Sequence, residues 1–113
     1  MTVEELVQRL DLHVAVGGEA LSREVTGGYC GDLLSWVMSR AQSGDAWFTV
    51  MGNVNSIAVA MLADVACIVL CEDAPLDEDA RACAGKGNCR AGERGECLPA
   101  RLPVVYADLT NIV

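Results

Sequence analysis

Apolar residues recur along the chain with two alternating periods. In residues 3–10 they fall at the i, i+3, i+4 and i+7 positions of a helix: Val3, Leu6, Val7 and Leu10. Thr2 precedes this segment and Glu5 follows three residues later, the arrangement of a capping box. Residues 12–18 (LHVAVGG) instead alternate apolar with small or polar residues, as in a strand that ends in a turn. The chain is therefore predicted to begin with a short helix and a strand.

The middle of the chain predicts helix, strand and helix. Asp32 is predicted to be the N-cap of a helix with one apolar face, formed by Leu33, Leu34, Val37 and Ala41. Gly44 is well placed to end this helix, and residues 46–51 (AWFTVM) have the β-branched and aromatic content of a strand. Asn55 is predicted to cap a second helix over 56–65 (SIAVAMLADV). That helix is apolar almost all round, so we expect it to be largely buried.

The last third of the chain predicts strand, helix and strand. Residues 66–71 (ACIVLC) form a short apolar run typical of a buried parallel strand. Pro75 and the acidic residues 77–79 favour a helix start, and residues 102–108 (LPVVYAD) read as a closing strand. Alternating strands and helices indicate an α/β fold. We predict a single layered domain over 1–113, with a mainly parallel sheet of about four to five strands and crossover helices.

One segment, residues 83–101, interrupts this alternation. It is rich in glycine, cysteine and basic residues, and we interpret it as a loop insertion between the last helix and the last strand. Cys83, Cys89 and Cys97 are close in sequence, as the ligands of a soft metal are. Their C-x5-C-x7-C spacing lacks the C-x2-C of zinc knuckles and ferredoxins. A zinc or iron–sulfur site, with Cys71 or a second subunit as fourth ligand, is thus an alternative to redox-active or incidental thiols.

Charge and composition narrow the classes of partner. The 113 residues carry a formal net charge of −8 and no dense run of lysine and arginine, which argues against nucleic acid as a partner. No stretch approaches the roughly 18 apolar residues of a membrane span, and the first ten residues do not resemble a signal peptide. We therefore expect a cytoplasmic protein with no membrane contact, whose six cysteines are free thiols or metal ligands.

The doublet Gly27-Gly28 precedes the helix predicted from Asp32. The one Gly-Lys pair, Gly85-Lys86, has Ala80 at the upstream glycine position, so no phosphate-binding P-loop is present. We interpret the doublet as a tight, positive-φ corner between strand and helix, with anion binding at the free helix amides as the alternative. Such a ligand site would contain six residues: Thr26, Gly27, Gly28 and Asp32, facing Asn53 and Asn55.

No catalytic constellation is apparent in the sequence. The single histidine, His13, stands inside a strand pattern with no cysteine or carboxylate at ligand spacing, so we interpret it as structural. None of the serines lies in a nucleophile-elbow pattern. We therefore predict that the chain is not an enzyme.

Trp36 lies beside the apolar stripe of its helix, a position that suits the rim of a core or a subunit contact.

Residues 24–80 carry the resemblance to a known family. The ordered set Thr-Gly-Gly (26–28), Gly-Asp-Leu-Leu (31–34), AWFTV, NSIAVAMLAD and CIVLCED resembles the DRTGG domain family, with weaker similarity towards both ends. The family's leading Asp-Arg is replaced here by Glu24 and Val25. Residues 83–101 are a second departure, because family members generally pass directly from the last helix to the last strand.

The resemblance implies an accessory role. The DRTGG domain is similar to the N-terminal domain of the kinase/phosphatase that acts on the histidine-containing phosphocarrier protein, and it also accompanies CBS domains in regulated pyrophosphatases. It is associated there with regulation and subunit contacts. Short stand-alone members resemble proteins of anaerobes, some encoded near iron–sulfur redox enzymes. We thus expect a non-catalytic regulatory or interaction domain that forms homo-oligomers and senses a small anionic ligand, with a redox enzyme as a candidate protein partner.

Overall fold

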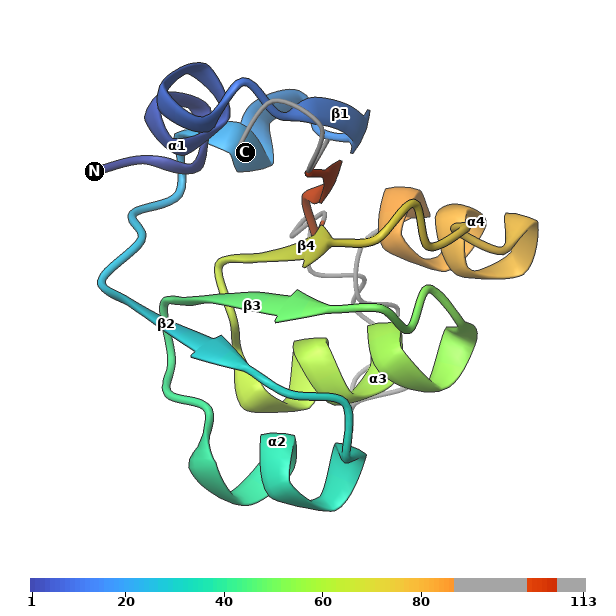
Figure 1. Cartoon of the computed structure of the whole chain (residues 1–113). Coiled ribbons are helices and arrows are strands. Elements are labelled where there is room, and N and C mark those ends of the chain that lie inside the picture. The colour runs from blue at the N-terminus through green and yellow to red at the C-terminus, as the bar shows by residue number, and fades with distance from the viewer. Residues whose placement is uncertain (87–101, 108–113) are drawn as a thin grey trace, which may run out of the picture.

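The computed structural model describes residues 1–86 and 102–107, which form one α/β domain (Figure 1). In chain order its elements are α1 (Val3–Leu10), β1 (His13–Val16), the 3-10 helix η1 (Gly18–Ser22), β2 (Gly27–Cys30), α2 (Leu34–Arg40), β3 (Asp45–Thr49), α3 (Val54–Ala63), β4 (Cys67–Leu70), α4 (Glu78–Lys86) and β5 (Val104–Tyr106). The predicted insertion at 83–101 lies largely outside the described residues; its first four belong to α4.

The five strands form one mixed sheet in the order β1-β5-β4-β3-β2. Strands β2 to β5 pair in parallel, and β1 pairs antiparallel with β5. The pairing of β1 with β5 shifts register between Val14 and Val16. The predicted α/β class and mainly parallel sheet are confirmed.

Helices cover both faces of the sheet. Helices α2, α3 and α4 pack on one face, and α1 packs on the other (Figure 1). Trp47 and Ile68 point to the first layer, while Ala46 and Val69 point to the second. Strand β4 is buried at every position, because parallel strands with both faces covered contact no water. The four parallel strands, β2 to β5, thus place their carboxyl ends at one end of the sheet.

Capping explains where the helices begin, and it corrects two predictions. Thr2 caps α1 as predicted, with its hydroxyl accepting the backbone N–H of Glu5 at 3.2 Å. Asn53, not Asn55, caps α3, because its side-chain oxygen reaches the Ser56 amide at 2.9 Å. Leu33, not Asp32, is the N-cap of α2 and provides no side-chain hydrogen bond. The Asp32 carboxylate instead accepts hydrogen bonds from Thr49, the last residue of β3, and from Val50, the residue after it.

Asp64 ties the end of α3 to two other segments. Its left-handed backbone (φ 59°) ends the helix. Its carboxylate accepts a 2.6 Å hydrogen bond from the Ser43 hydroxyl and forms a 3.0 Å ion pair with Arg23. The Ser43 hydrogen bond and then the Arg23 interactions lower the pKa of Asp64 from its ordinary value of 3.8. The ionised carboxylate therefore stabilises the folded chain.

We expect this stabilisation to disappear in acid. With a lowered folded-state pKa, the contribution of Asp64 is fully present above pH 3.8 and is lost as the pH falls through the folded value. In Asp64→Asn the left-handed backbone is tolerated but the titration is removed. The melting temperatures of wild type and variant should differ at neutral pH and converge as the pH is lowered below 3.8. A difference that stays constant with pH would contradict this role.

Candidate functional site

The glycine doublet lies in a strand, not at a corner. Gly27 and Gly28 are the first two residues of β2 and pair in parallel with Asp45 and Ala46 of β3. Among the described glycines only Gly18 and Gly44 have positive φ, so the predicted positive-φ corner is wrong at this position. The turn into α2 comes after β2, at residues 31–33.

Close packing explains why glycine stands at position 27. A Cβ there would lie 2.6 Å from Oδ1 of Asp45, a buried carboxylate whose Oδ2 accepts the Gln42 amide at 2.8 Å. Thr26 packs in turn against Gly44, to which it is linked by a 3.0 Å backbone hydrogen bond. The Thr-Gly-Gly segment thus fits against the start of β3.

The six predicted ligand residues are not brought together. Thr26, Gly27 and Gly28 lie at the amino end of β2, while Asp32 and Asn53 follow the carboxyl ends of β2 and β3. A four-residue strand separates the two groups by roughly 13 Å. Asp32 Oδ1 accepts hydrogen bonds from the Thr49 hydroxyl at 2.8 Å and the Val50 amide at 3.2 Å. Asn55 is an exposed residue in the first turn of α3.

The described cysteines differ in environment. Cys67 is buried in β4, and burial raises the pKa of its thiol to about 12, which makes the thiol unreactive at neutral pH. Burial also raises the pKa of Cys71, with smaller contributions from Cys30, Glu72 and Asp32. Cys30 is exposed at the end of β2. Cys67 thus acts as a small apolar core residue, as its position in a buried strand predicts.

The predicted metal ligands fall mainly outside the described part of the chain. Cys83 is exposed on α4, whereas Cys89 and Cys97 lie outside the described residues. Within residues 1–86 and 102–107, no three or more histidine, cysteine or acidic side chains are grouped so as to hold a metal ion. The zinc or iron–sulfur site stays a prediction.

Trp36 lies on the outer surface of α2. Its side chain is 50% exposed, and the guanidinium carbon of Arg40 lies 4.0 Å from the centre of its ring, the geometry of a cation–π contact. Leu33, one turn earlier, is 55% exposed. The prediction that Leu33 belongs to the buried stripe is wrong, because the helix begins one residue later and turns this side chain outward.

The outer side of α3 is also apolar and exposed. The prediction of a largely buried helix holds for Ser56, Ile57 and Ala60, which face the sheet. Val54, Ala58 and Leu62 follow one another at four-residue spacing on the opposite side, and Leu62 is 56% exposed. Helices α2 and α3 pack against each other, and we call the exposed apolar residues on their outer sides the α2–α3 face: Leu33, Trp36, Val54, Ala58 and Leu62.

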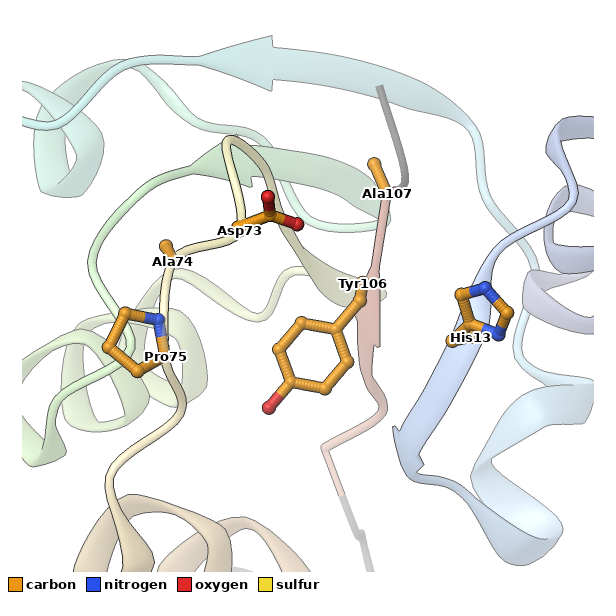
Figure 2. Close-up of a pocket in the computed structure, with 6 residues that line it drawn as sticks. All are labelled: His13, Asp73, Ala74, Pro75, Tyr106 and Ala107. Atoms are coloured by element: carbon orange, nitrogen blue, oxygen red, sulfur yellow. The ribbon is translucent and has the colours of Figure 1, made fainter. Parts of the chain in front are cut away.

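A pocket of about 380 Å³ opens at the carboxyl ends of β4 and β5. It lies towards the edge of the sheet formed by β1, away from the edge formed by β2. Figure 2 shows the Tyr106 ring between Pro75 and His13, with the Asp73 carboxylate beside Ala107. His13 and Tyr106 are directly opposite partners on β1 and β5. The lining residues are His13, Asp73, Ala74, Pro75, Tyr106 and Ala107. In open α/β sheets, ligands bind beyond the carboxyl ends of the strands, which is where this pocket lies.

The turn that carries Asp73 has an unusual backbone. Glu72 (φ 60°) and Asp73 (φ 55°) are both left-handed, and the Ala74 amide closes the turn on the Cys71 carbonyl at 3.1 Å. Left-handed backbone costs a residue with a side chain roughly 1–2 kcal/mol, and such turns usually contain asparagine and glycine. Strain of this kind is concentrated at functional sites.

Sequence reasoning missed this pocket. The sequence pattern predicts a structural role for His13, and of the acidic residues after β4 only 77–79 enter a prediction, as a helix start. A carboxylate directly after a buried parallel strand is a usable signal, because strand carboxyl ends form the ligand edge of the sheet. The pairing of His13 with Tyr106 has no such signal, since 93 positions separate them in the sequence.

Within residues 1–86 and 102–107, no helix combines the length and the apolar character needed to cross a membrane. No protein-family model matches the sequence, and no match was found among curated proteins or among solved structures.

Proposed function

We propose that this chain is a non-catalytic interaction domain that binds a second copy of itself through the α2–α3 face. The observation that carries the proposal is the exposure of large apolar side chains on two adjacent helices. Trp36, Leu33 and Leu62 are each at least half exposed. A helix that is apolar almost all round, as α3 is, is normally covered almost all round.

The charge distribution favours a second copy as the occupant. The 7 residues of α2 and the 10 residues of α3 include one charged side chain, Arg40, in a chain of which 21% is charged. Two chains of net charge −8 repel each other, and the α2–α3 face lets them meet without placing carboxylates opposite one another. A symmetric dimer uses the same patch on both subunits, so a face with few charges is self-complementary.

The types of residue on the face agree with an interface. Tryptophan, methionine and arginine are enriched at protein interfaces, and tryptophan and arginine dominate their binding energy. Trp36 and Arg40, which contact each other on α2, supply the two residue types that dominate binding energy. The resemblance to DRTGG domains supports the same role, since that family is associated with regulation and subunit contacts. We propose that regulation or binding of a further protein partner is built on this dimer.

Placing a carboxylate on the α2–α3 face tests the proposal. In Leu62→Glu we expect the dimer dissociation constant to rise about thirtyfold or more, because each subunit would have to bury a charge at the interface. Trp36→Ala should weaken the dimer similarly through lost contact area. Light scattering coupled to size-exclusion chromatography gives the mass of each variant.

Leu10→Glu is the matched control, because Leu10 is 45% exposed on α1, on the other side of the sheet. It should assemble like wild type, and far-ultraviolet circular dichroism should show that all three variants are folded. Equal masses for wild type and Leu62→Glu would refute the proposed interface.

A further inference from the structure

The pocket beyond β4 and β5 combines a carboxylate with an aromatic ring. Asp73 contributes two acceptor oxygens, and Tyr106 contributes a ring face with its hydroxyl at the far end (Figure 2). Pro75, Ala74 and Ala107 supply apolar walls. A carboxylate beside an aromatic ring is a set of groups that attracts a cation, through an ion pair and a cation–π contact.

The surrounding charge disfavours an anion in this pocket. Among the described residues that line it there is neither a lysine nor an arginine. Arg81 of α4 instead directs its Nη1 to the backbone carbonyl of Ala15, at 3.1 Å. Glu72 adds a second carboxylate to the turn of Asp73, and the chain as a whole carries a charge of −8. A cation is therefore drawn towards the pocket and a carboxylate or phosphate is repelled.

The walls of the pocket are held in place without a ligand. Gly52, after β3, pairs with Leu76, and its carbonyl accepts the Asp77 amide at 2.8 Å, which fixes the chain around Pro75. On the opposite side, His13 is fixed by its pairing with Tyr106. A site that exists before binding loses little conformational entropy when a ligand enters.

We propose that this pocket binds a small organic cation, an ammonium or amidinium group attached to a compact apolar body. The cationic group pairs with Asp73, and the body packs between Tyr106, Pro75 and the His13 ring. The volume of about 380 Å³ is within the range of pockets that enclose small molecules. The strained backbone at Glu72 and Asp73 is explained if the turn is retained to present this carboxylate.

Three compounds of nearly equal shape and different charge test the proposal. The chain, labelled with ¹⁵N, is titrated with benzamidinium, with neutral benzamide and with benzoate, and the backbone amide signals are followed by NMR. Benzamidinium should shift the signals of His13, Asp73, Ala74, Tyr106 and Ala107 saturably, whereas benzamide and benzoate should leave them nearly unchanged. Benzoate shifting the same signals as strongly, or benzamidinium shifting none of them, would overturn the proposal.

The variant Asp73→Asn removes the charge and keeps a residue that tolerates left-handed backbone. Its affinity for benzamidinium should fall about tenfold or more, as expected for the loss of a charge-assisted hydrogen bond. Asp79→Asn is the control, because Asp79 is an exposed carboxylate on α4 outside the pocket lining. This variant should bind benzamidinium like wild type. Unchanged affinity in Asp73→Asn would also count against the proposal.

Discussion

Replacing Trp47 with alanine is expected to lower the free energy of unfolding by about 3–5 kcal/mol. Trp47 is fully buried in β3, at the centre of the layer between the sheet and helices α2 to α4. Its indole N–H donates a 2.9 Å hydrogen bond to the carbonyl of Gly31, which joins the loop before α2 to the sheet. Alanine would leave a large cavity and an unpaired carbonyl. Urea unfolding followed by circular dichroism measures the loss.

Trp47→Phe separates packing from the hydrogen bond. Phenylalanine fills most of the cavity but cannot donate to Gly31, so the loss should be clearly smaller than in Trp47→Ala. Equal losses in the two variants would mean that the hydrogen bond, rather than the filled volume, is the main contribution of Trp47. That result would contradict the packing described for this layer.

Gly52→Ala is expected to destabilise the chain by about 1–3 kcal/mol and to weaken binding in the pocket. A Cβ at position 52 would collide with the Pro75 carbonyl oxygen and lie 3.0 Å from Leu76 Cα. Both atoms belong to the backbone, so the segment that forms one wall of the pocket must move. Urea unfolding gives the stability, and titration with benzamidinium gives the affinity.

Gly28→Ala is the matched control for this substitution. A Cβ at position 28 would lie 3.7 Å from the Ala46 carbonyl oxygen and 3.8 Å from Phe48, which is ordinary contact. Both changes restrict the unfolded chain in the same way, so their difference reports the folded state. Gly28→Ala should be as stable as wild type or more so. Equal stabilities for the two variants would contradict the close approach at Gly52.

The fold could be predicted because its signals are local. The apolar run 66–71 marks the buried central strand, and the apolar stripe of residues 3–10 marks α1. Capping was predicted less well, since Asp32, Asn53 and Asn55 are all good capping residues by type. The tertiary hydrogen bond from Thr49 decides that Asp32 does not cap α2.

The candidate sites depend on contacts between distant segments. The requirement for glycine at position 27 arises from Asp45 on the next strand. The pocket joins His13, Asp73 and Tyr106 from three separate parts of the chain. The sequence alone predicts that α3 is covered almost all round. Only the folded chain shows that its outer side is exposed.

Sedimentation equilibrium of the unmodified chain tests the proposed self-association most directly. Measured from micromolar to millimolar concentration, the mass should rise to twice the 11.9 kDa of one chain and no further, since a symmetric interface is closed. The Leu62→Glu variant should remain at the mass of one chain over the same range. A wild-type mass of one chain at every concentration would contradict the proposal that the α2–α3 face binds a second copy.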